Sequence, residues 1–171
     1  MIIAKEALSA GLNLIDRDPS PQKFLAASVS YLEYIIGRFI AQGRNNLVHL
    51  GQRILADNED DQRIRRDIER TLEDTETRLE ALVVSAARYC TGSVPGTKQF
   101  VQAANEFINF YNNVLAQRKN PAQEIIQKYF SDDEYWQMTD DVTEESIATE
   151  QRLFDAVRED APDGVDFDWK G

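Results

Sequence analysis

The amino-acid sequence predicts an all-α protein: an antiparallel, up-down four-helix bundle with short extra helices and an acidic C-terminal tail. Two observations lead to this fold class. Apolar residues recur in steps of three and four from Pro21 to about Val157, which is the period of a helix face that packs on a core. The loop signals between these segments are short, which favours antiparallel neighbours. With 171 residues, 42% of them hydrophobic, the chain is long enough for one domain, which we place at residues 1–157, followed by the tail at 158–171.

The first predicted helix begins at Pro21, because Ser20 followed by proline is typical of an N-cap and a first helical position. Gly43 lies on the apolar face of this helix, where a glycine permits close helix approach or a kink. The acidic run at residues 57–61 predicts the end of this helix and the start of the next. The expected buried face comprises Leu25, Val29, Leu32, Ile36, Phe39, Gly43, Leu47, Leu50 and Ile54.

The second predicted helix runs to about Cys90. On its polar face, opposite charges recur at spacing i, i+4, as in Arg63 and Asp67, which indicates a solvated surface. Cys90 ends the apolar face and is expected to pack there as a small buried hydrophobe. Residues 91–96 predict a loop. The apolar face comprises Ile64, Ile68, Leu72, Thr75, Leu79, Leu82, Ala86 and Cys90.

A third helix is expected over residues 98–119, the most aromatic part of the chain, and shorter helices follow it. Asn120-Pro121 repeats the pattern of a cap followed by proline. Residues 131–134 have the spacing of a capping box and predict a short helix through Trp136. Residues 141–144 have the same spacing and precede the last predicted helix.

The net charge of −11 is confined to the end of the chain. Residues 1–130 carry 16 acidic and 16 basic side chains, whereas residues 131–171 carry 14 acidic and three basic ones. Phosphate binding needs clustered cations, so we expect no nucleic-acid partner. A basic protein partner is the alternative to a tail that only improves solubility.

The composition points away from membranes and from secretion. The longest strongly apolar runs are only a few residues, far below the ~20 residues that span a bilayer. The start, Met1–Leu14, contains Lys5 and Glu6 and has no cleavage-type motif, so it is a poor signal peptide. A single cysteine cannot form an intramolecular disulfide, which fits a reducing compartment. We therefore expect a cytoplasmic protein that binds no membrane.

The sequence lacks the common catalytic motifs. It has no phosphate-binding glycine loop, no dinucleotide fingerprint and no nucleophile elbow. His49 is the only histidine, so a multi-histidine metal site, or a triad that uses Cys90, is not easily built. We expect His49 to be partly buried and hydrogen-bonded rather than a ligand. These observations predict a protein that is not an enzyme and that binds no metal and no cofactor.

Two acidic residues nevertheless lie in apolar surroundings, Glu33 after Leu32 and Glu106 before Phe107. For each, two interpretations are open: an inward carboxylate that lines a pocket, or an outward carboxylate held by an ion pair. The third helix adds a row of amides, which predicts either a solvated surface or a polar pocket. The resulting candidate interior pocket comprises Glu33, His49, Glu106, Tyr111, Asn113 and Gln117.

Three segments occur in a recognisable order: Phe110–Gln117, then Pro121-Ala122, then Asp132–Trp136. This layout resembles a hemerythrin-type bundle, a family of cation-binding four-helix proteins whose members bind two irons through histidines and carboxylates. By position, Asn113 stands where the resemblance implies a ligand histidine, and Gln117 where it implies a glutamate. Because amides are poor iron ligands, the resemblance implies a degenerate member that has lost its metal site.

Three functions are therefore open. The first is a non-catalytic interaction or regulatory bundle, hemerythrin-like but without the di-iron site, with an unidentified and basic protein partner. The second is a bundle that binds a metal or a small ligand through Glu33, Glu106 and polar residues of the core. The third is a helper subunit of a larger enzyme that offers its acidic tail to a basic partner. A homodimer through the aromatic third helix is an open alternative for the assembly.

Overall fold

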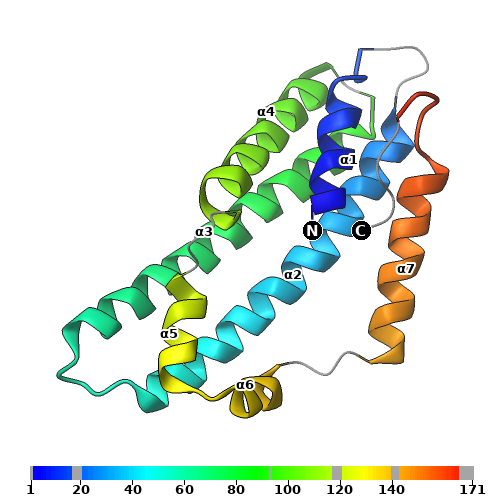
Figure 1. The fold of residues 1–171 in the computed structure, drawn as a ribbon. Helices are drawn as coiled ribbons and strands as arrows, with labels where there is room; N and C mark the ends of the chain where they lie inside the picture. Colours follow the sequence, from blue (N-terminus) through cyan, green and yellow to red (C-terminus); the bar gives the residue numbers. More distant parts are fainter. Residues whose placement is uncertain (1, 17–20, 93, 117–120, 140–142, 166–171) are drawn as a thin grey trace.

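All regular elements in the described part of the chain are helices (Figure 1). The computed structural model describes residues 2–16, 21–92, 94–116, 121–139 and 143–165. The prediction of an all-α protein is thus confirmed. Within these ranges the elements are α1 Ile2–Leu12, α2 Gln22–Arg53, α3 Glu59–Tyr89, α4 Val94–Phe110, the π-helical turn η1 Tyr111–Leu115, α5 Pro121–Tyr129, α6 Asp132–Met138 and α7 Glu144–Glu159.

The helices α2 and α3 form a long antiparallel hairpin that runs the length of the molecule (Figure 1). The predicted apolar face of α2 is buried except at Phe39, which is 36% exposed, and at the half-buried Gly43. A Cβ atom on Gly43 would lie 2.8 Å from Cδ2 of Leu72 on α3. Gly43 therefore permits close approach of the two helices, the first of the two roles that its position suggests.

The shorter helices pack along this hairpin (Figure 1). Helix α1 contacts α2 and α4, α4 contacts α3, and α7 packs along α2. Helix α1 is absent from the sequence-based prediction, although Ala4, Ala7, Leu8 and Gly11 recur at helical spacing. The buried core that joins these helices comprises Ala4, Ala7, Leu8, Phe24, Leu25, Val29, Tyr31, Leu32, Ile36, Ile40, Leu79, Leu82, Ala86, Tyr89, Phe100, Ala104, Phe107 and Val157. We call it the main core.

A separate, smaller core lies at the other end of the hairpin. Helix α5 contacts both α2 and α3 there, and α6 follows it along the edge of the molecule (Figure 1). The shorter helices that the sequence predicts after Pro121 are present as α5, α6 and α7. The buried residues of this end core are Leu50, Ile54, Ile125, Ile126, Phe130 and Met138.

Several predicted helix ends shift in the structure. Helix α4 begins at Val94, so the predicted loop at 91–96 is shorter, and Gly92 makes the turn with φ +75°. The capping box at Ser131 is confirmed. Thr143 caps α7 by accepting the backbone N–H of Ser146. The predicted caps at residues 20, 120 and 141 lie outside the described residues, as does the end of the acidic tail after residue 165.

Cys90 is exposed, so the prediction that it packs in the core is wrong. Helix α3 ends one residue earlier, at Tyr89, and Cys90 is the residue that follows its last helical position. The ring of Tyr89 fills the core at this end and stacks on Phe100 with a centroid distance of 5.0 Å. Cys90 consequently lies beyond the part of the helix that is covered by α4.

Helix α2 has the length and composition that a membrane-spanning helix needs, with a mean hydropathy of 1.3 over its most apolar 18 residues. The sequence-based statement that no segment is apolar enough to span a bilayer is therefore too strong. In the structure α2 packs against α1, α3 and α7, as the central helix of a helical bundle does. Its composition is weak evidence for a membrane span, because central helices of bundles meet the same criterion.

Candidate functional site

The structure does not assemble the interior pocket that the sequence predicts. Glu33 and Glu106 are both exposed. Glu33 follows the buried Leu32, and one residue of helix turns a side chain by about 100°, which carries Glu33 onto the exposed flank of α2. Glu106 lies on α4, where its Oε1 accepts a hydrogen bond from Gln102 Nε2 at 2.9 Å. The prediction that these carboxylates line an interior site is therefore wrong.

Glu106 instead lines a shallow surface groove between α3 and α4, with a volume of about 230 Å³. The guanidinium of Arg78, which also lines the groove, lies 4.9 Å from the ring centroid of Phe110. In the described ranges, no group of three or more His, Cys, Asp or Glu side chains is placed to hold a metal ion. The groove is thus a feature of the surface and not an interior pocket of the bundle.

The pocket residues predicted on the third helix are also dispersed. Tyr111 is buried where the π-helical turn begins, and its ring centroid lies 5.9 Å from Nζ of Lys5. Burial, followed by the charge of Glu6, raises the pKa of Tyr111. Asn113 is exposed, which agrees with a solvated amide row, and Gln117 lies outside the described residues.

His49 lies half-buried on a polar face of α2 that the sequence analysis does not single out. Asn45, His49 and Arg53 are four residues apart and therefore share this face. Sixteen residues of helix, roughly 24 Å, separate His49 from Glu33, so the two cannot form one site. The face with Asn45, His49 and Arg53 is the one that holds α6.

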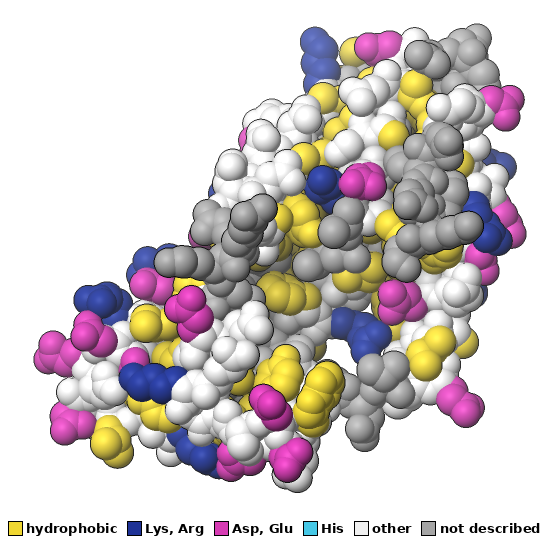
Figure 2. Space-filling model, viewed as in Figure 1, with side chains coloured by type: hydrophobic (Ala, Val, Ile, Leu, Met, Phe, Trp, Pro, Cys, Tyr) yellow, Lys and Arg dark blue, Asp and Glu magenta, His cyan; other side chains and the backbone are white. Residues whose placement is uncertain are grey.

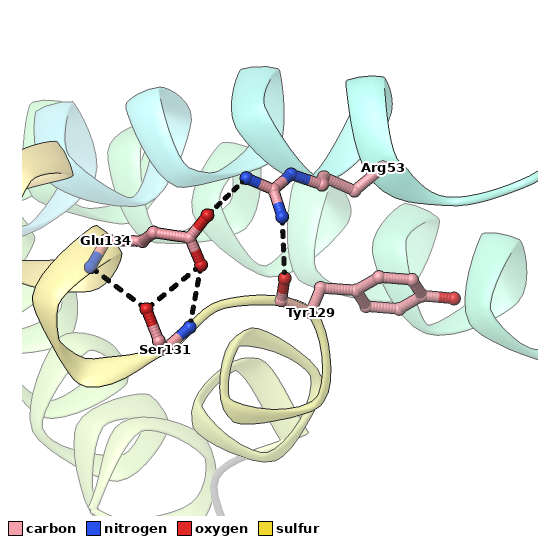
Figure 3. Close-up of polar contacts among 4 residues, drawn as sticks. All are labelled: Arg53, Tyr129, Ser131 and Glu134. Atoms are coloured by element: carbon pink, nitrogen blue, oxygen red, sulfur yellow. Dashed lines mark hydrogen bonds and ion pairs between the residues drawn. The ribbon is translucent and has the colours of Figure 1, made fainter.

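Arg53 connects the end of α2 to the start of α6 (Figure 3). Its Nη2 lies 2.6 Å from Oε1 of Glu134, its Nη1 donates to the carbonyl oxygen of Tyr129 at 3.3 Å, and its guanidinium lies 4.8 Å from the ring centroid of Phe130. The other oxygen of Glu134 accepts the backbone N–H of Ser131 at 2.9 Å. Because Glu134 accepts from Ser131 and from Arg53, its pKa falls to about 2.

The C-terminal end of α6 is held by amide side chains of α2. The carbonyl oxygen of Met138 accepts Nδ2 of Asn45 at 2.6 Å and Nε2 of Gln42 at 3.1 Å. These donors satisfy a carbonyl at the end of a helix, where an intrahelical partner is lacking. With Arg53 at its start and two amides at its end, α6 has both ends fixed to one helix.

Asp61 fixes the preceding helix, α5, to the start of α3. Its side chain is the one charged group that is buried among the described residues, with 4% of the residue exposed. Its Oδ2 accepts Nζ of Lys128 at 2.6 Å, Nδ2 of Asn58 at 2.7 Å and the hydroxyl of Tyr129. The hydrogen bond from Lys128 is the largest cause of a lowered pKa at Asp61, and the same contacts raise the pKa values of Lys128 and Tyr129.

The outward side of α6 is formed by Asp132, Asp133, Trp136 and Gln137, all of them exposed, and we call these four residues the α6 face. Trp136 has 70% of its surface exposed, whereas Met138 points into the end core. Figure 2 shows acidic and apolar side chains next to one another over α6 at the lower edge of the molecule. The indole offers an apolar surface, and the neighbouring carboxylates offer hydrogen-bond acceptors, so together they are suited to binding.

Comparison with known proteins adds no candidate for the function. No protein-family model, no curated protein and no solved structure matches this chain. A fold alone does not determine a function, so the function has to be inferred from the chemistry of a site. Among the described residues, the α6 face is the surface from which we infer the function.

Proposed function

We propose that the protein is a non-catalytic interaction module of the cytoplasm, and that the α6 face is its contact surface. The observation that carries this proposal is the exposure of Trp136 on a helix whose two ends are fixed by side chains of α2. In this proposal, residues 1–157 form an up-down four-helix bundle domain of hemerythrin-like descent without an iron site, and α6 carries the contact surface. The exposed thiol of Cys90, unpaired in the described structure, supports a reducing compartment.

The energetics favour a contact role for Trp136. Covering the exposed part of the indole buries on the order of 150 Å² of apolar surface, which contributes roughly 4 kcal/mol at about 25 cal/mol/Å². Tryptophan is among the residues that dominate binding energy at protein interfaces. Because α6 is already held in place, a partner need not order it, and less of the interaction energy is lost on binding.

The test is a comparison of binding by two variants with equally exposed apolar side chains. Trp136→Ala removes the proposed contact. The matched control is Val94→Ala at the start of α4, because Val94 is 71% exposed. We expect a cellular protein to be retained in equal molar amount by the wild-type chain and by Val94→Ala, and to be lost with Trp136→Ala. Retention of every bound protein by Trp136→Ala would contradict the proposal.

The alternative function, a metal or small-ligand site that uses interior carboxylates, loses its main support. It needs Glu33 and Glu106 to face the interior, and both are exposed. Substituting both with glutamine is expected to change the free energy of unfolding by less than about 0.5 kcal/mol, as for other surface positions.

A further inference from the structure

We infer that the α6 face binds a cationic protein segment, with an arginine guanidinium stacked on Trp136 and paired with Asp132 and Asp133. This inference rests on the proposed function and names the chemistry of the partner. Two features of the described structure support it: the positions of the side chains on α6 and the ion pairing of the charged groups around them.

The geometry of α6 places both carboxylates beside the indole. Asp132 and Asp133 precede Trp136 by four and three residues, and residues at these spacings are neighbours on the surface of a helix. The ring of Tyr135 meets that of Trp136 edge to face, with a centroid distance of 5.8 Å, which steadies the indole. The α6 face therefore presents one aromatic surface with two acceptors at its border.

At this end of the molecule, some charged side chains have ion-pair partners among the described residues and others do not. Glu134 is paired with Arg53, and Asp61 is paired with Lys128, so these two cations are engaged in holding α5 and α6 in place. Asp132 and Asp133, in contrast, have no ion pair with any described residue. The exposed surface is left with negative charge, and the complementary partner is positive.

Arginine suits this surface better than other cationic or polar groups. Its planar guanidinium stacks on an indole and donates two parallel hydrogen bonds to a carboxylate, whereas the ammonium of lysine acts as a point charge. Phosphate-bearing partners, nucleic acid or an anionic lipid surface, would be repelled by the two carboxylates. The proposed occupant is therefore an arginine-containing segment of another protein.

The test uses the full chain with Trp169→Phe, so that Trp136 is the only source of indole fluorescence. The probes are three synthetic peptides of equal length, built from alanine and four spaced arginines, four lysines or four glutamines. The arginine peptide is expected to shift the emission of Trp136 in a saturable way. We expect the lysine peptide to bind about threefold or more weakly and the glutamine peptide to leave the emission unchanged.

Two double variants then separate a specific site from general attraction to an acidic protein. Asp132→Asn with Asp133→Asn is expected to weaken binding of the arginine peptide about fivefold or more and to flatten its salt dependence. The matched control is Glu144→Gln with Glu145→Gln, a second exposed acidic pair at the start of α7 beside the exposed Ile147. The control is expected to leave the affinity within about twofold.

The outcomes distinguish this inference from the proposed function. If a cellular protein is lost with Trp136→Ala but still binds the chain with Asp132→Asn and Asp133→Asn, the interaction function stands and the cationic partner is wrong. If the arginine peptide binds both double variants equally, the site is also wrong. Self-association that depends on Trp136, measured by sedimentation, would identify a second copy of the chain as the occupant and would overturn the inference in that way.

Discussion

Arg53 and Arg44 lie nine residues apart on α2, and each pairs with one glutamate. Arg44 contacts Glu76 on α3, and both side chains are about half exposed. Arg53 contacts Glu134, but also the carbonyl oxygen of Tyr129 and the ring of Phe130. Exposed ion pairs contribute little by themselves, so the additional contacts of Arg53 make it the more important of the two side chains.

Replacing Arg53 with methionine is therefore expected to loosen α6 without unfolding the protein. Amides of residues 132–138 should exchange with solvent roughly tenfold faster, the effect of losing about 1–2 kcal/mol of local contacts. Arg44→Met, which removes a single surface pair, is the control and should leave these amides unchanged. The measurement is hydrogen exchange followed by mass spectrometry. Equal exchange in the two variants would show that Arg53 does not hold α6.

The two acidic groups of this end predict a loss of stability in acid. The pKa of Glu134 is lowered to about 2 in the folded protein, below its ordinary value of 4.5, and that of Asp61 is lowered as well. A carboxyl group whose pKa is lower in the folded protein stabilises the fold at pH values above its ordinary pKa. This stabilisation is lost as the pH falls toward the pKa of the folded state. The urea midpoint should therefore decline from about pH 4.5 to pH 2.

The variants Glu134→Gln and Asp61→Asn should each show a shallower decline than the wild-type chain, because each lacks one of the titrating groups. Asp61→Asn should also unfold at lower urea at pH 7, since Lys128 and Tyr129 lose their ionised partner. Asp133→Asn, at an exposed position without an ion pair to a described residue, is the control. A decline as steep in Glu134→Gln as in the wild type would contradict the assignment.

At the scale of single residues, the sequence predicts identity and spacing better than orientation. Glu33 lies beside the correctly predicted apolar face of α2. Each residue of a helix turns the side chain by about 100°, so the pattern of apolar residues does not determine whether a side chain at the border of that face points toward the core. Arg53 and Asn45 read as ordinary polar residues, because their partners on α6 are about 80 or more residues away in the chain. Such partners become visible only when the helices are packed.

At the scale of elements, two of the three glycines of α2, Gly37 and Gly43, lie in contrasting environments and give a third prediction. A Cβ on Gly43 would meet the buried Leu72 at 2.8 Å, whereas a Cβ on Gly37 would meet nothing within 4 Å. Alanine favours a helix over glycine by about 1 kcal/mol, so Gly37→Ala should raise the free energy of unfolding by about 0.5–1 kcal/mol.

Gly43→Ala makes the same change in helix propensity but also crowds Leu72. Its free energy of unfolding should be about 1–3 kcal/mol below that of Gly37→Ala, the usual cost of adding a methyl group to a well-packed contact. Urea unfolding of both variants measures this difference directly. Equal stabilities would mean that α2 and α3 separate at no cost, contrary to the close approach described above.

The elements that the sequence predicts well are those with strong local signals. The apolar faces of α2 and α3 follow a helical period bounded by turn residues, and α6 begins with a capping box. Helix α1 is missed because it is short and carries small residues, which bury little surface and give a weak period. The start of α4 is misplaced because the residues from Val94 to Gly96 read as a loop, although proline is tolerated in the first turn of a helix.

At the scale of the whole molecule, the two cores divide the protein into parts of unequal size. The main core joins α1, α2, α3, α4 and α7, whereas the end core contains six buried residues in the described part of the chain. Both depend on the same two long helices, so the end core cannot form without the hairpin. Because regions with few buried apolar contacts open more readily than the rest, α5 and α6 should open before the main core does.

This order gives the fourth prediction. Ile125→Ala, in the end core, should increase amide exchange in residues 121–138 while leaving most of the main core protected. Phe107→Ala, fully buried in the main core, should lower the free energy of unfolding by about 3–5 kcal/mol and increase exchange throughout the chain. The check is native-state hydrogen exchange at several urea concentrations. Uniform exchange in both variants would show that the two cores unfold as one unit.

The position of Cys90 has a practical consequence for measuring binding. It is the only thiol in the chain, it is exposed, and it follows the last residue of α3, the helix that also contacts α5 (Figure 1). The 31 residues of α3 span roughly 46 Å. Coupling the protein to a sensor surface through this thiol would attach every chain at the same residue. Trp136 would then face the solution, far from the attachment point.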